Sequence, residues 1–95
     1  MSALPPLPSA RCVIADDERL MREQLRARLA EVWPQLQVLA EARNGAEAVA
    51  LVAEHRPDLV FLDIRMPGLD GVEAARQILQ LPPTEDWEGC EIVFI

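Results

Sequence analysis

The apolar residues of the chain fall into two kinds of pattern that alternate along it. Short, nearly continuous apolar runs predict buried strands, and they cover residues 11–15, 37–42, 58–63 and 91–95. Between these runs, apolar residues recur every three or four positions, which predicts helices with one apolar face. The predicted helices run from residue 18 until Pro34 stops the pattern, over 46–55, and over 71–80.

The helical stretches also carry the signals of their own ends and inner faces. Asn44 and Asp70 precede the second and third helices, where short polar side chains can cap the first turn. The repeating apolar positions predict which side chains face the core. They are Leu20, Met21, Leu25, Leu29 and Val32 in the first helix, and Val72, Ala75, Ile78 and Leu79 in the third.

Strands that alternate with helices indicate an α/β fold with a parallel, doubly wound sheet and helices on both of its faces. The strands are apolar along their whole length rather than at every second residue, which is typical of strands buried on both sides. In such sheets ligands bind outside the carboxyl ends of the strands. Those ends are therefore where functional side chains are expected.

Composition and charge exclude several classes of function. Sixteen acidic residues face nine arginines, for a net charge of −7, so direct nucleic-acid binding by this segment is not expected. No apolar run approaches the ~20 residues of a membrane span. Cys12 and Cys90 lack a metal-binding spacing and are expected to be free thiols of a cytoplasmic protein. Residues 1–10 contain three prolines and are expected to form a disordered or extended leader.

Three carboxylates stand at the expected ligand-binding edge. Asp16 and Asp17 follow the first strand, and Asp63 ends the third. A single acid at a strand end is usually just solvated, but if these two strands are neighbours the three acids converge. At ~4 Å separation and an effective dielectric of ~20, each pair would repel by about 4 kcal/mol. A divalent cation would offset this repulsion, and Mg²⁺ suits carboxylate and water ligands.

The stretches "VIADDERLMREQL", "LVFLDIRMPGLDG" and "IVFI" resemble the receiver domain (CheY-like) of two-component response regulators. The resemblance implies a flavodoxin-like sheet with the strands in the order second, first, third, fourth. It implies that Asp63 accepts a phosphoryl group from a sensor histidine kinase. Asp17 would bind Mg²⁺ directly, Asp16 would assist partly through water, and the backbone carbonyl of Arg65 would complete the protein ligands. The implied role is a signalling switch that regulates transcription through an output domain, not an enzyme.

The sequence also departs from the family pattern. A receiver has five strands and five helices, whereas this pattern ends at the fourth strand, so residues 11–95 are interpreted as a partial receiver. The family's Ser or Thr would follow Ile95, and its lysine has no counterpart, since the chain has no lysine. Phosphorylation is therefore expected to be inefficient. The strand 91–95 is expected to form an exposed edge through which the chain self-associates.

Two other functions stay open from the sequence alone. A haloacid-dehalogenase-type phosphatase also uses Mg²⁺ and an aspartate nucleophile, but it has a second aspartate where Arg65 stands here. A pseudo-receiver that binds partners without phosphorylation would lack part of the acid set.

Smaller signals lie in the loops. The loop around Trp87 and the following "IVFI" resemble receivers attached to LytTR-type DNA-binding domains, and Trp87 itself could cover the core edge or contact a partner. Gly68 and Gly71 would permit unusual backbone conformations near the acceptor.

Overall fold

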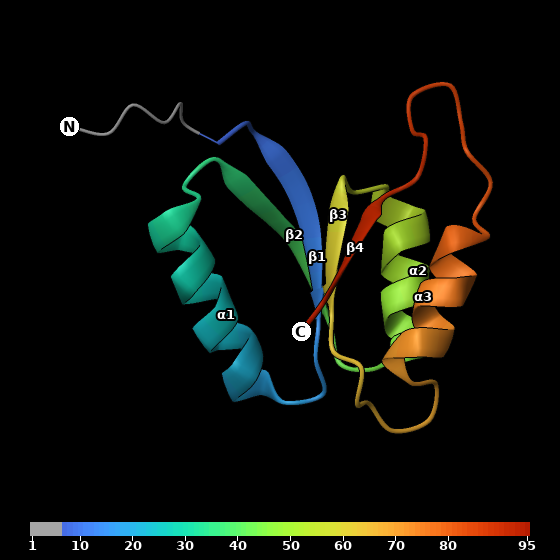
Figure 1. The fold of residues 1–95 in the computed structure, drawn as a ribbon, viewed down its shortest axis with the longest axis horizontal. Helices are drawn as coiled ribbons and strands as arrows, with labels where there is room; N and C mark the ends of the chain where they lie inside the picture. Colours follow the sequence, from blue (N-terminus) through green and yellow to red (C-terminus); the bar gives the residue numbers. More distant parts are fainter. Residues whose placement is uncertain (1–6) are drawn as a thin grey trace.

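The computed structural model describes residues 7–95 and shows one parallel sheet between two helical layers (Figure 1). The strands are β1 (Ala10–Ala15), β2 (Leu36–Ala42), β3 (Leu59–Leu62) and β4 (Glu91–Phe94). The helices are α1 (Arg19–Val32), α2 (Gly45–His55) and α3 (Gly71–Leu79). All pairings are parallel and the strand order is β2-β1-β3-β4, so the predicted fold and strand order are confirmed.

The boundaries differ from the predicted ones by one or two residues. The largest consequence is at the start, where Ala10 already belongs to β1 although it was assigned to the leader. The indole N–H of Trp33 donates to the carbonyl of Pro8 at 2.7 Å, which holds the entry to β1 against the end of α1. The remainder of the predicted leader, residues 1–6, lies outside the described residues.

The two faces of the sheet carry two separate apolar clusters. The face covered by α2 and α3 is built on Val13, Ala15, Val60 and Leu62. The opposite face is built on Cys12, Ile14, Leu59 and Phe61, and among the described elements only α1 covers it. Both cysteines are free, as predicted, and burial raises their pKa to about 11, so neither thiol is reactive at neutral pH.

The predicted inner faces of the first and third helices are partly wrong. Leu20, Met21 and Val32 of α1 are exposed, and so are Val72 and Leu79 of α3. In α3 the predicted residues Ala75 and Ile78 do contact the core, and the small residue Ala74, which was not predicted, joins them. Small side chains let a helix approach closely, so the buried stripe need not contain the largest apolar residues.

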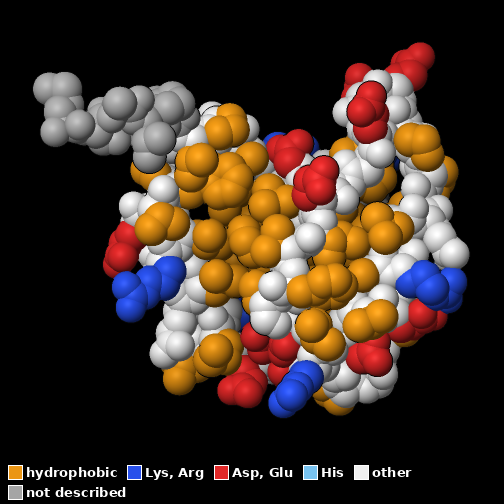
Figure 2. Space-filling model, in the orientation of Figure 1, with side chains coloured by type: hydrophobic (Ala, Val, Ile, Leu, Met, Phe, Trp, Pro, Cys, Tyr) orange, Lys and Arg blue, Asp and Glu red, His pale blue; other side chains and the backbone are white. Residues whose placement is uncertain are grey.

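Exposed apolar side chains gather on the face that is viewed in Figure 2, over β4 and the side of α1 next to it. Val93, Phe94 and Ile95 are each between 39% and 46% exposed, and Met21 of α1 is 47% exposed. Within residues 7–95, no helix is long and apolar enough to cross a membrane.

Candidate functional site

The carboxyl ends of β1 and β3 lie side by side because Ala15 pairs with Leu62 in the ladder. The residues that follow are Asp16 and Asp17 on one strand and Asp63 on the other, and the N–H of Asp63 donates to the carbonyl of Ala15 at 2.9 Å. One carboxylate oxygen from each acid lies within 4.8 Å of the other two. The predicted convergence of the three acids is therefore confirmed.

Asp16 is the most enclosed of the three, with 8% of its surface exposed. Its backbone N–H donates to the carbonyl of Ala42 on β2 at 3.1 Å, and its Oδ1 accepts the N–H of Glu18 at 2.9 Å. Burial raises the pKa of Asp16; the Glu18 hydrogen bond opposes the shift and the charges of Asp63 and Asp17 add to it. The site thus holds more negative charge than its surroundings favour.

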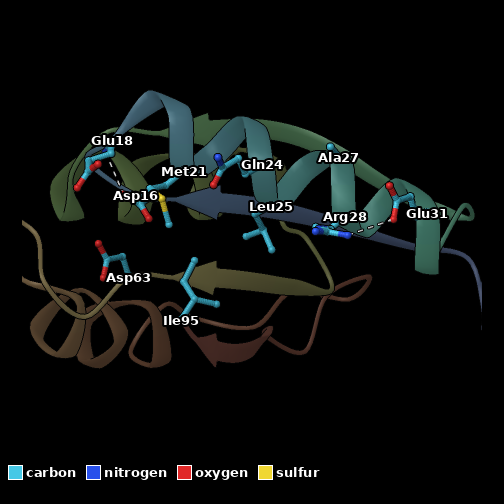
Figure 3. Close-up of a pocket in the computed structure, with 10 residues that line it drawn as sticks. All are labelled: Asp16, Glu18, Met21, Gln24, Leu25, Ala27, Arg28, Glu31, Asp63 and Ile95. Atoms are coloured by element: carbon cyan, nitrogen blue, oxygen red, sulfur yellow. Dashed lines mark hydrogen bonds and ion pairs between the residues drawn. The ribbon is translucent and has the colours of Figure 1, made fainter.

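Asp63 is half-buried and faces Asp16 across the end of the sheet (Figure 3). Its Oδ1 accepts the backbone N–H of Arg65 at 3.0 Å, so the following loop turns back over the carboxylate. Arg65 stands two residues after Asp63, and its side chain is exposed. The role of its carbonyl as a ligand stays a prediction.

Two glycines shape this loop for different reasons. Gly68 has φ of 74°, a left-handed conformation that favours glycine, as expected. Gly71 has no positive φ, so the expectation of an unusual conformation was wrong there. A Cβ on Gly71 would instead overlap the carbonyl oxygen of Asp63 and come within 2.6 Å of the Cα of Ile64. The start of α3 therefore packs directly against the backbone of Asp63 and Ile64.

A groove begins at the acid cluster and runs along α1 (Figure 3). It has a volume of about 690 Å³ and lies between α1 and the end of β4. Met21, Leu25 and Ile95 form its apolar lining, while Asp16 and Asp63 close one end. No pattern in the sequence predicts this groove, because it depends on how α1 lies across the sheet.

Sequence reasoning also missed Arg22, which is buried beside the acid loop with 8% of its surface exposed. Its guanidinium donates to the backbone carbonyl of Asp16 at 2.7 Å and to Glu41 at 2.9 Å. Arg22 is one of four arginines in the first predicted helix, and its partner Glu41 is nineteen residues away. Only the folded arrangement distinguishes it from its solvent-exposed neighbours.

The donor set of the cluster fits a hard divalent cation. Each of the three acids offers a carboxylate oxygen, and the mutual repulsion of the acids would be relieved by positive charge. Mg²⁺ binds oxygen ligands, often one or two carboxylates with several retained waters. The exposure of Asp17 leaves room for such waters.

Comparison with known proteins gives a consistent result. A family model described as "Response regulator receiver domain" matches residues 12–95. An uncharacterized response regulatory protein of Vibrio cholerae is 54% identical over 70 residues, which is 74% of this chain and 27% of that protein. A protein-glutamate methylesterase/protein-glutamine glutaminase of Haloarcula marismortui is 43% identical over 74 residues, 78% of this chain and 20% of that protein.

A solved structure shows the same likeness in three dimensions. The crystal structure of a two-component response regulator of the LuxR family from Aurantimonas matches with a TM-score of 0.74 and 38% identity. The match covers 92% of this chain and 58% of that one. Set beside the two curated relatives, the matched segment is about a quarter of their length or less. The activities named for the Haloarcula protein are those of that whole protein.

Proposed function

Because this chain belongs to the response regulator receiver domain family, we propose that Asp63 is its phospho-acceptor and receives the phosphoryl group from a sensor histidine kinase. The observation that carries the proposal is the convergence of three carboxylate oxygens within 4.8 Å at the ends of β1 and β3. Asp17 and Asp16 would hold Mg²⁺ together with Asp63 and the backbone carbonyl of Arg65. The acid set of a receiver is complete, which does not favour a pseudo-receiver.

The geometry supports a nucleophilic role for Asp63. A carboxylate oxygen of Asp63 forms a bond to phosphorus as the bond between phosphorus and the donor's imidazole nitrogen breaks, and that nitrogen keeps the electron pair. When bound, Mg²⁺ supplies positive charge that offsets the negative charge of the phosphoryl oxygens and the acids. The N–H of Arg65 holds Oδ1 of Asp63, so the other oxygen is the one left for attack.

The phosphatase alternative fits the site less well. The residue two positions after Asp63 is Arg65, whose side chain is exposed and whose N–H holds the acceptor. The proposed role is therefore a switch that keeps its phosphoryl group. A cytoplasmic location is part of the proposal, supported by two free cysteines. We also propose a LytTR-type DNA-binding output domain, on the sequence resemblance of the loop before β4.

Incubation with acetyl phosphate and Mg²⁺, followed by peptide mass spectrometry, tests the acceptor. We expect a phosphoryl adduct on Asp63 and none in Asp63→Asn. Asp70→Asn is the matched control, because it removes one charge from the same loop and asparagine caps a helix as well as aspartate. An adduct that persists in Asp63→Asn, or steady release of phosphate without any adduct, would overturn the proposal.

We further propose that the polypeptide of residues 1–95 self-associates through β4. The N–H groups of Glu91 and Ile95 bond to Asp58 and Leu62, next to and in β3, so the strand's alternation turns those of Ile92 and Phe94 outward. Among the described residues, no strand pairs with that outer edge. A second copy related by a two-fold axis would pair the edge and cover the exposed apolar side chains beside it.

Analytical ultracentrifugation of this polypeptide at micromolar concentration tests the association. We expect dimers or larger species, and we expect Val93→Lys to shift the population toward monomer. Val93 is 39% exposed, whereas Ile92 packs against the core, so a lysine at 93 changes the edge without opening the core. A wild-type polypeptide that sediments only as monomer would contradict the proposal. A segment following Ile95 in a longer polypeptide would compete for the same edge.

A further inference from the structure

We propose that Arg22 is a positioning residue for the Mg²⁺ site, an inference that rests on the function proposed above. Arg22 touches none of the three carboxylates in the structure. It binds the backbone between two of them instead. Its guanidinium would thereby fix the orientation of Asp17 relative to Asp16 before any cation arrives.

The contact is with the peptide unit that joins the acid pair. The Nη1 of Arg22 donates to the carbonyl oxygen of Asp16 at 2.7 Å, and both groups are buried. That carbonyl belongs to the same planar peptide as the N–H of Asp17. Rotation of this peptide would swing Asp17 away from Asp16, which is itself held by Ala42 and Glu18. Arg22 therefore restrains the exposed acid of the pair.

Arg22 is itself held in place by a residue on another element. Its Nε donates to Oε1 of Glu41 on β2 at 2.9 Å, and the other oxygen of Glu41 accepts Nη1 of Arg26 at 2.8 Å. Burial opposes ionisation of Glu41, but hydrogen bonds from both arginines outweigh it and keep its pKa below the usual value. Glu41 thus stays a carboxylate and ties the orientation of Arg22 to the sheet.

The arrangement offers its own control. Arg26 shares Glu41 with Arg22 and carries the same charge, but its side chain is half-exposed and makes no hydrogen bond to the acid loop. Simple electrostatics predicts that loss of either arginine tightens Mg²⁺ binding, since a nearby positive charge repels the cation. Positioning predicts the opposite sign, and only for Arg22. The direction of the change therefore separates the two explanations.

The experiment measures Mg²⁺ affinity by isothermal titration calorimetry and by NMR shifts of backbone amides, for the wild type, Arg22→Gln, Arg26→Gln and Glu41→Gln. We expect Arg22→Gln to bind Mg²⁺ about ten-fold more weakly, the lower end of what loss of an outer-shell partner usually costs. Glu41→Gln should show a smaller loss in the same direction, and Arg26→Gln should bind as well as the wild type or better. Each titration is made where circular dichroism shows the variant to be fully folded.

The outcomes distinguish this inference from the proposed function. If the wild type does not bind Mg²⁺, the proposed metal site fails. If the wild type binds and folded Arg22→Gln binds as tightly or tighter, the positioning role is wrong while the metal site stands. If Arg22→Gln does not fold, Arg22→Lys takes its place, because a lysine keeps the charge but cannot donate to Glu41 and the Asp16 carbonyl in the same fork. Wild-type affinity in Arg22→Lys would also overturn the inference.

Discussion

Asp17→Ala is expected to weaken Mg²⁺ binding at least about 100-fold, because it removes a carboxylate that would contact the cation directly. Two unit charges ~4 Å apart interact by about 4 kcal/mol at an effective dielectric of ~20, and a divalent ion at ligand distance gains more. Asp17 is the exposed member of the cluster, so its replacement leaves the core unchanged. Calorimetric titration with MgCl₂ measures the effect.

Asp86→Ala is the matched control for this measurement. It removes the same charge from an exposed loop at the amino ends of the strands, whereas the acid cluster lies at the carboxyl ends (Figure 1). We expect this variant to bind Mg²⁺ with nearly wild-type affinity. An Asp17→Ala variant that binds as well as the wild type would show that Asp17 is not a ligand. Equal losses in both variants would mean that net charge, and not a defined site, attracts the cation.

The strands and the acid site could be predicted because their signals are local. Continuous apolar runs predict all four strands, and Asp16 and Asp63 stand at the carboxyl ends of two of them, so parallel pairing was enough to bring these two acids together. The capping roles of Asn44 and Asp70 are also confirmed, since each accepts a backbone N–H from the first turn of its helix. These features depend on a few neighbouring residues and on one rule of sheet topology.

The features that could not be predicted depend on contacts between distant segments. The buried face of α3 includes Ala74 and not Val72, and α3 packs against α2 on this side of the sheet. The burial of Arg22, on α1, depends on its ion pair with Glu41 on β2. The role of Gly71 follows from the backbone of Asp63 passing against the helix start. In each case the residue can be read from the sequence, but the distant residue that it contacts cannot be predicted from it.

Trp87 shows how the structure decides between two interpretations of one residue. From the sequence, its loop could either cover the edge of the core or contact a partner. In the structure Trp87 is 7% exposed and packs in the cluster beneath α2 and α3. Its indole N–H donates to the carbonyl of the buried Pro57 at 2.8 Å. A residue so enclosed has little surface left for a partner, and its loop is anchored by it.

Trp87→Ala is therefore expected to lower the free energy of unfolding by about 3–5 kcal/mol, the usual cost of truncating a buried tryptophan. A domain of this length has roughly 5–14 kcal/mol in total, so much of its stability would be lost. Trp87→Phe keeps one aromatic ring in the core but leaves the Pro57 carbonyl unpaired, which costs about 1–3 kcal/mol. Urea denaturation followed by far-ultraviolet circular dichroism measures both changes.

Trp33→Ala supplies the comparison that makes this result specific. Trp33 also donates its indole N–H to a proline carbonyl, that of Pro8, but it is only half-buried at the end of α1. Less apolar surface is lost on its removal, so we expect a cost of about 1–2 kcal/mol. Similar costs for the two tryptophans would mean that the loop before β4 is not anchored by Trp87. An unchanged free energy of unfolding in Trp87→Ala would favour the other interpretation, that Trp87 contacts a partner.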